Sequence, residues 1–120
     1  MSSFHTPGEA AHRTGLSLDT LRYYERIGLL AGVGRTPGGQ RKYSDDDIGW
    51  LEILRCLRET GMPIQRMREY AELCRVDDSI AARVELLEAH DRDVRRHIAT
   101  LQAQRTHLQQ KIAYYRAVRS

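Results

Sequence analysis

The 120-residue sequence has few aromatic residues, with one tryptophan, one phenylalanine and six tyrosines, while 29% of its residues are charged. A chain of this size and composition can bury a modest hydrophobic core. In largely helical chains, a small core is often completed by association with a second copy. We therefore expect one small domain with a protruding element, in a dimeric state.

Other absences exclude whole classes of protein. No apolar run is long enough to cross a membrane and the N-terminus lacks a signal-peptide pattern, so we expect a cytoplasmic protein with no membrane partner. The two cysteines, Cys56 and Cys74, are too far apart for a CxxC motif, and a disulfide is not expected in the cytosol. Clusters of catalytic serine, histidine and aspartate, phosphate-binding loops and HExxH motifs are missing, so we predict no enzymatic activity and no cofactor.

The positive charge is concentrated at one end of the chain. Residues 1–43 contain six lysines and arginines against three acidic residues, a net charge of +3, whereas residues 44–120 contain thirteen of each. The whole basic excess therefore lies in the N-terminal third. A surface that binds nucleic acid would need it there.

Residues 6–28 contain the signals of two short helices joined by a tight turn. Thr6 begins the first helix within a capping box, and Gly15 ends it. Ser17 caps the second helix, and Gly28 ends it. This spacing predicts a helix-turn-helix, although a helical hairpin of an unrelated bundle would show the same pattern. On the second helix, three residues at helical spacing are expected to face inward: Leu18, Leu21 and Ile27.

The outer face of the second helix mixes arginine, tyrosine and hydroxyl side chains, which suits a DNA groove. Residues 33–43 then predict a β-hairpin with a Gly38-Gly39 turn and a basic second strand, which beside a helix-turn-helix favours a wing that contacts the DNA backbone. Thr20 and Arg22 are the expected groove contacts. The full set of predicted DNA-binding residues is Ser17, Thr20, Arg22, Tyr23, Tyr24, Arg26, Arg35, Arg41, Lys42 and Tyr43.

Residues 45–75 predict a second pair of helices, with an N-cap at Ser44 and a break at Gly61. These helices complete a DNA-binding domain over residues 1–75. Residues 1–5 are expected to be frayed at the terminus.

Residues 80–118 predict one long helix with a heptad repeat. Eight of the ten a and d positions are apolar, which favours a two-helix coiled coil. The exceptions are Asp91 and Arg105, which would each meet their own copy in a parallel pair but could pair with each other in an antiparallel one. We therefore predict an antiparallel homodimer. The predicted dimerisation residues are Val84, Leu87, Asp91, Val94, Ile98, Leu101, Arg105, Leu108, Ile112 and Tyr115.

Three motifs in this order resemble the MerR family of bacterial transcription regulators: Leu-Arg-Tyr-Tyr-Glu-Arg-Ile-Gly-Leu-Leu (21–30), Gly-Gln-Arg-Lys-Tyr-Ser (39–44) and Leu-Arg-Glu-Thr-Gly-Met-Pro-Ile (57–64). The resemblance implies a mainly α fold: a winged helix-turn-helix domain with a small β-hairpin wing, followed by a long antiparallel coiled-coil helix. It also implies a homodimer on double-stranded promoter DNA with an overlong spacer. Such proteins distort the DNA so that RNA polymerase holoenzyme engages both promoter elements.

Residues 50–63 and 111–115 resemble the branch of this family that responds to aldehydes and other thiol-reactive stress. That branch has a cysteine at the position of Cys56, which becomes the candidate sensor. Arg55 and Arg58 would favour a reactive thiolate, although neighbouring glutamates oppose them. The alternative is that Cys56 is a small packing residue.

Three other functions remain open. Metal-sensing relatives use paired cysteines in a loop after the dimer helix, which this sequence lacks, so no metal site is expected. Cys74 with His90 or His97 could nevertheless form one. A ligand-responsive regulator would need residues after the coil. An excisionase-like architectural DNA-binding protein would share the winged helix without needing the heptads.

Overall fold

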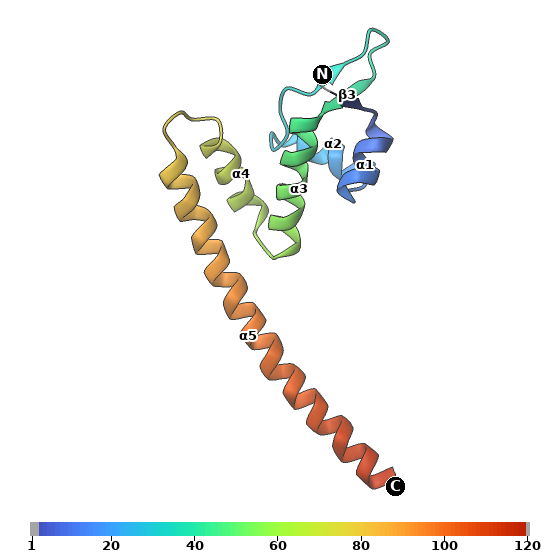
Figure 1. Cartoon of the computed structure of the whole chain (residues 1–120), viewed down its shortest axis with the longest axis vertical. Coiled ribbons are helices and arrows are strands. Elements are labelled where there is room, and N and C mark those ends of the chain that lie inside the picture. Colours follow the sequence, from blue (N-terminus) through green and yellow to red (C-terminus); the bar gives the residue numbers. More distant parts are fainter. Residues whose placement is uncertain (1–2, 120) are drawn as a thin grey trace. The chain divides into compact units, whose positions relative to one another are not determined.

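A computed structural model of the chain describes residues 3–119. The chain divides into two units between Ser79 and Ile80, and each is described by itself. The first unit contains β1 (Phe4–His5), α1 (Pro7–Thr14), α2 (Leu18–Arg26), β2 (Gly34–Arg35), β3 (Arg41–Ser44), α3 (Asp45–Glu59) and α4 (Ile64–Leu73), and the second is α5 (Ile80–Arg119) (Figure 1). The predicted fold class, mainly helical with a small antiparallel wing and a long C-terminal helix, is confirmed.

Two helices of the first unit begin with reciprocal caps. At α1, Thr6 Oγ1 accepts a bond from the Glu9 amide at 3.1 Å, and Glu9 Oε1 accepts one from the Thr6 amide at 2.9 Å. At α3, Ser44 and Asp47 make the same pair of bonds, at 3.1 and 3.0 Å. Each pair satisfies two amides that have no partner inside the helix. The bonds from Thr6 also hold the pKa of the Glu9 carboxyl below its usual value.

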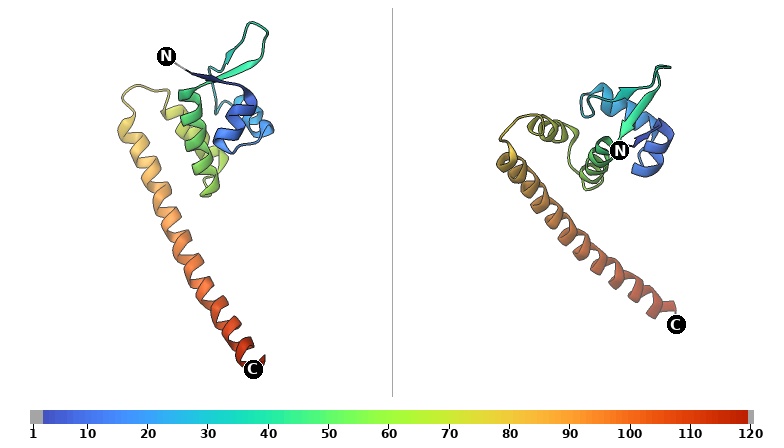
Figure 2. Two further views of the ribbon diagram at one scale, coloured as in Figure 1. Left: turned by 45° about the vertical axis from the view of Figure 1, so that its right-hand side comes forward. Right: turned by 45° about the horizontal axis from the view of Figure 1, so that its top comes forward.

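The strands form a small antiparallel sheet in the order β1-β3-β2. Gly34 lies opposite Lys42 in the wing hairpin, which projects from the helices in Figure 2. The expectation that the first five residues are frayed is wrong for Phe4 and His5, which pair with β3, while residues 1 and 2 lie outside the described part of the chain. His5 is buried, and its Nε2 lies 2.8 Å from Asp45 Oδ1, so a tertiary contact holds this strand in place.

The core of the first unit corrects the predicted inward face of α2. Leu21 and Tyr24 are buried there, whereas Leu18 is 42% exposed and Ile27 is half-buried. Residues three apart on a helix are rotated by about 60°, so four such residues spread over about half of the helix surface. The two central ones face the core, and the outer two lie at its margins. Apolar side chains of the flanking segments fill the rest: Leu29, Leu30, Tyr43, Ile48, Leu51, Leu54, Leu57, Met62, Met67, Tyr70 and Ala71.

Trp50 joins three segments of this core. Its indole Nε1 donates to the Leu29 carbonyl at 2.7 Å, and its ring stacks on Tyr70 of α4 with centroids 5.6 Å apart. The loop after α2 is thereby tied to both α3 and α4.

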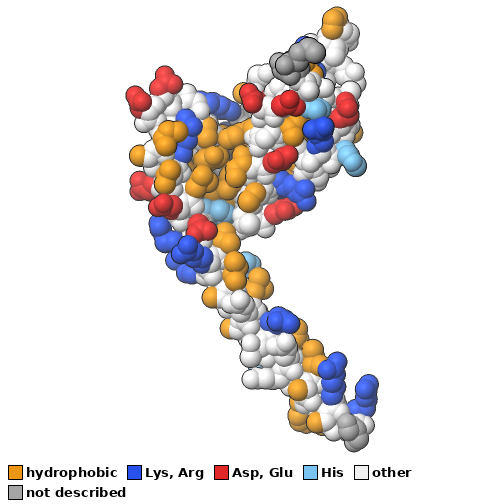
Figure 3. All heavy atoms as spheres, in the orientation of Figure 1, with side chains coloured by type: hydrophobic (Ala, Val, Ile, Leu, Met, Phe, Trp, Pro, Cys, Tyr) orange, Lys and Arg blue, Asp and Glu red, His pale blue; other side chains and the backbone are white. Residues whose placement is uncertain are grey.

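The second unit is one continuous helix of 40 residues. Most of its predicted heptad positions are exposed in the single chain, and hydrophobic side chains are visible along it in Figure 3. Leu87 and Val94 are half-buried, and Leu86, which the heptad leaves out, is buried. Asp91, the predicted partner of Arg105 in the second copy, pairs within its own helix with Arg95 at 3.1 Å. None of the helices over residues 3–119 combines the length and apolarity needed to span a bilayer.

Candidate nucleic-acid interface

The N-terminus of α2 presents two hydroxyl groups at the helix-turn-helix turn. Ser17 Oγ accepts a bond from the Thr20 amide at 3.1 Å, and the two side-chain oxygens lie 2.9 Å apart. Both residues line a surface hollow of about 290 Å³. Side-chain oxygens and helix N-termini are common partners of DNA phosphates and base edges.

Arg22 and Arg26 stand four residues apart on α2, so they lie on the same side of the helix. The Arg22 side chain is 61% exposed, and its nearest acidic group, Asp19, is 3.8 Å away. The Arg26 guanidinium lies 5.4 Å from the centroid of the Tyr23 ring. This stacking leaves the edge of the guanidinium available for an external acceptor.

The two wing arginines meet a carboxylate of α2. Arg41 Nε donates to Glu25 Oε2 at 2.6 Å, and Arg35 Nη2 lies 4.0 Å from Glu25 Oε1. Arg35 Nη1 also donates to the Gly39 carbonyl in the hairpin turn at 3.1 Å. Because Arg41 bonds through Nε, its terminal nitrogens carry the donors that remain for DNA.

Lys42 lies on the opposite face of β3 from Arg41, because side chains alternate along a strand. Its Nζ is 4.4 Å from the centroid of the Phe4 ring. Its stem crosses Gly34 so closely that a side-chain carbon there would come within 3.0 Å of Lys42 Cε. Phe4 is therefore a neighbour of the interface that the sequence did not reveal, because a two-residue strand shows no periodicity.

Tyr24 and Tyr43 are corrections to the predicted DNA-binding set. Their exposed fractions are 0% and 1%, because both rings belong to the core. Burial, followed by the charge of Glu25, raises the pKa of the Tyr43 hydroxyl. The Tyr24 hydroxyl finds no hydrogen-bond partner among the described residues. Tyr24 was in the predicted set because it stands within the arginine- and tyrosine-containing segment of residues 22–26, but that composition does not show which side of the helix a residue faces.

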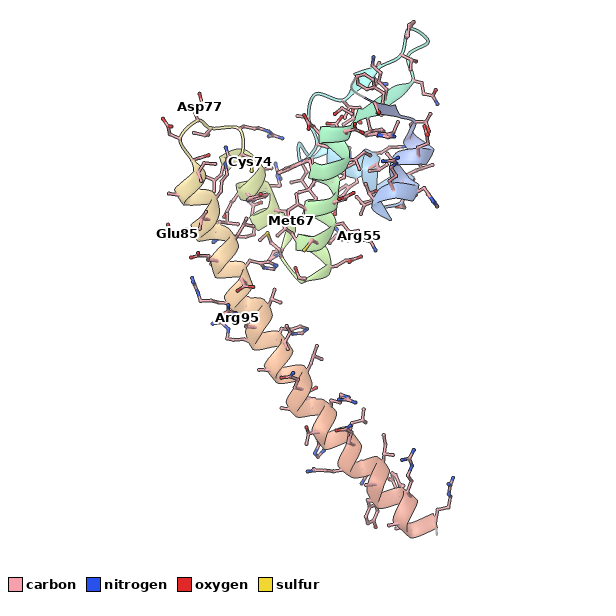
Figure 4. The ribbon with its side chains drawn as sticks, in the orientation of Figure 1. Arg55, Met67, Cys74, Asp77, Glu85 and Arg95 are labelled. Carbon is pink, nitrogen blue, oxygen red and sulfur yellow. The ribbon has the colours of Figure 1, made fainter. Side chains whose placement is uncertain are left out.

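Arginines of α3 extend the surface beyond the predicted set. Arg55 and Arg58 line the same hollow as Ser17 and Thr20. Arg55 Nη1 donates to the Thr14 carbonyl at 2.8 Å, which ties α3 to the end of α1 (Figure 4). The signal for this placement was their spacing: residues three apart on a helix share a face.

The Arg55 guanidinium also depends on the glycine at the turn. Gly15 has a φ of 73°, and a Cβ there would lie 2.1 Å from Arg55 Nη1. The other side of the guanidinium pairs with Glu59, with Nε 2.8 Å from Oε1. Glycine therefore serves both the left-handed turn and the close approach of Arg55.

Cys56 is an exposed thiol in α3, next to Arg55 in sequence, while Cys74 is half-buried, and neither is part of a disulfide among the described residues. In the described part of the chain, no three histidine, cysteine or acidic side chains gather into a possible metal site. The thiol therefore lies on the same helix as the arginines that reach the helix-turn-helix.

Comparisons with known proteins identify the family. Residues 5–74 match the family model described as MerR HTH family regulatory protein, and residues 48–111 match the model described as MerR, DNA binding. An uncharacterised HTH-type transcriptional regulator of Haemophilus influenzae is 37% identical over 117 residues, which is 97% of this chain and 87% of that protein. The regulator AdhR of Bacillus subtilis is 40% identical over 80 residues, or 66% of this chain and 57% of that protein.

Solved structures agree. The structure of HiNmlR, described as a MerR family regulator lacking the sensor domain and bound to promoter DNA, matches with a TM-score of 0.88 at 37% identity, over 95% of this chain and 87% of that one. A MerR family regulator from Listeria monocytogenes matches with a TM-score of 0.84 at 34% identity, over 92% of this chain and 85% of that one. The chain therefore belongs to the MerR family of DNA-binding transcription regulators.

Proposed function

We propose that two copies of this chain bind a two-fold promoter site and distort its overlong spacer, so that RNA polymerase can engage both promoter elements. The observation that carries the proposal is the set of hydroxyl and guanidinium groups on α2 and α3 that line one hollow, together with the wing arginines that meet Glu25 of α2. The promoter-bound state of HiNmlR, a structure of similar fold, supports it. A distorted spacer would bring the two promoter elements into register for the polymerase.

In this proposal the DNA-binding residues have two roles. Groove contacts come from Ser17, Thr20 and Arg22 at the exposed side of α2. Backbone contacts come from the remaining exposed or half-buried groups: Tyr23, Arg26, Arg35, Arg41, Lys42 and Arg58. Phosphate contacts add affinity regardless of sequence, whereas groove contacts select the operator.

Transcription in vitro tests the spacer mechanism. With purified polymerase, the protein is expected to activate a promoter with an overlong spacer and to repress or leave unchanged a version shortened to the ordinary length. Equal activation of both promoters would contradict the mechanism. The Arg22→Ala variant is expected to lose about 1–3 kcal/mol of operator discrimination. Arg92→Ala, at an outward position of α5, is the matched control and is expected to bind as wild type.

The dimer is proposed from the heptad positions of α5 that are exposed in the single chain. Leu101→Asp places a charge at the centre of the predicted seam and is expected to yield monomers by sedimentation at concentrations where the wild type is dimeric. Gln110→Asp, at an outward heptad position, is the control. For the antiparallel direction, exchanging the charges of Asp91 and Arg105 together is expected to restore a dimer that either single reversal weakens.

We propose Cys56 as the trigger because its thiol is exposed and it stands in the sequence of α3 between Arg55 and Arg58, which line the hollow of the candidate DNA-binding surface. A thiol adds to the carbonyl carbon of an aldehyde, and the proton ends on the oxygen, so the product is a thiohemiacetal with no other reactant. The added group would lie on α3, the helix that carries Arg55 and Arg58. In this proposal a change at Cys56 alters DNA binding through that helix.

Transcription after treatment with formaldehyde tests this trigger in wild-type, Cys56→Ser and Cys74→Ser proteins. A response that disappears in Cys56→Ser and persists in Cys74→Ser is expected. If Cys56→Ser responds as wild type does, Cys56 is not the sensor and formaldehyde acts elsewhere. If wild type does not respond to formaldehyde, the alternative is a metal- or ligand-responsive member of the family.

A further inference from the structure

Glu25 is an acidic residue within the candidate DNA-binding surface, and phosphates should repel it. It lies on α2, directly before Arg26, and its side chain is 26% exposed. A carboxylate in this position lowers the affinity for DNA, because it cancels the charge of a nearby arginine, unless a structural role offsets that loss. The contacts of Glu25 indicate such a role.

The carboxylate of Glu25 joins α2 to both strands of the wing. One oxygen accepts the bond from Arg41 on β3 at 2.6 Å, and the other lies 4.0 Å from Arg35 on β2. Arg35 and Arg41 are opposite each other in the hairpin register. Arg35 also donates to the Gly39 carbonyl, so the connection reaches the hairpin turn.

The base of the wing is anchored, because β3 also pairs with β1 and buries Tyr43, but the outer part of the hairpin has fewer restraints. β2 is two residues long and β3 is four, and the two strands share two register pairs. A hairpin this short is not rigid by itself. A charge-assisted bond from a well-packed helix is stronger and more directional than a neutral one, so it can restrain the hairpin.

We propose that Glu25 is a positioning residue that sets the direction of the wing relative to α2, and that operator recognition depends on it. The proposal rests on the assignment of the wing to DNA binding. The proposal predicts that removing this negative charge from the DNA-binding surface weakens operator binding. Simple electrostatics predicts the opposite.

The test compares Glu25→Gln with Asp19→Asn, which removes a carboxylate from the same helix. In residues 3–119 Asp19 pairs with Arg22 and forms no ion pair with the wing. Two DNA probes are used: the duplex that wild-type protein selects from a random-sequence library, and a scrambled duplex of the same length. For Glu25→Gln, we expect operator affinity to fall about tenfold while scrambled-DNA affinity is unchanged or higher. For Asp19→Asn, we expect both affinities to rise.

A second variant keeps the test independent of folding. If Glu25 acts through Arg41, adding Glu25→Gln to Arg41→Gln should change operator affinity by less than twofold. The Arg41 Nε–H proton resonance should also move upfield in Glu25→Gln, as the bond to the carboxylate is lost. Thermal melting of each variant shows whether it is folded.

Three results would overturn the proposal. Glu25→Gln could raise both affinities as Asp19→Asn does, it could lower both equally while remaining folded, or its effect could add fully to that of Arg41→Gln. Failure of the DNA-binding surface itself has a different signature. In that case wild-type protein would not distinguish the two duplexes, and Arg22→Ala would bind as wild type does.

Discussion

Replacing Tyr24 with phenylalanine tests whether the Tyr24 hydroxyl is buried in the core, as the structure has it, or contacts DNA, as its sequence predicted. The ring of Tyr24 is completely buried, and its hydroxyl has no hydrogen-bond partner in residues 3–119. A buried hydroxyl without a partner destabilises the fold and contributes nothing to DNA binding. If the sequence-based prediction is correct, the same hydroxyl donates to a phosphate.

The magnitude follows from the cost of burying an unsatisfied hydroxyl, about 1–3 kcal/mol in proteins. Tyr24→Phe removes that cost and leaves a void the size of one oxygen atom, which destabilises the fold by ~0.3 kcal/mol. We expect the free energy of unfolding to rise by about 0.7–2.7 kcal/mol. For a domain of this size, each kcal/mol raises the melting temperature by about 4–8 °C.

Urea unfolding and thermal melting measure this effect, at matched protein concentration because a dimer's stability depends on it. Operator affinity is measured on the same preparations and is expected to be unchanged. Tyr23→Phe is the matched control, since its half-buried ring lies under Arg26. Here we expect stability within about 0.5 kcal/mol of wild type and operator affinity about fivefold lower. A less stable Tyr24→Phe protein, or one that loses operator affinity, would refute the structural reading.

Other changes test the remaining tertiary contacts. In urea unfolding, Gly15→Ala is expected to lower the free energy of unfolding by more than about 1 kcal/mol. Alanine is strained in the left-handed conformation of residue 15, and its Cβ would displace the Arg55 guanidinium. An unchanged free energy would contradict this. The bond from His5 lowers the pKa of Asp45, so the unfolded state binds the proton more readily. The free energy of unfolding is therefore expected to fall as pH drops below about 4, and Asp45→Asn should flatten that fall. An unchanged slope of stability between about pH 5 and 2 in Asp45→Asn would argue against the pair. Trp50→Phe is expected to lower the free energy of unfolding by about 1–3 kcal/mol, because the Leu29 carbonyl would remain buried without its donor. A melting temperature equal to that of wild type would contradict this.

Local signals determined much of this fold. The capping box at Thr6, the N-cap at Ser44 and the glycine at the turn were readable because each depends on residues within four positions of one another. The three motifs that resemble the MerR family also lie in contiguous stretches, so the family was evident before the structure. The candidate DNA-binding residues on α2 and the wing came from the same local composition.

Tertiary structure decided which of those residues face outward. Tyr23 and Tyr24 have identical side chains, and only the position of the core distinguishes the half-buried ring from the buried one. The contact of Arg41 with Glu25 spans 16 residues and that of Arg55 with Thr14 spans 41, beyond the reach of any local pattern. The chain's sequence thus determined its elements and its family, because these depend on short-range propensity and motif. Burial and long-range charge pairing depended on the packing of whole elements, which only the folded chain defines.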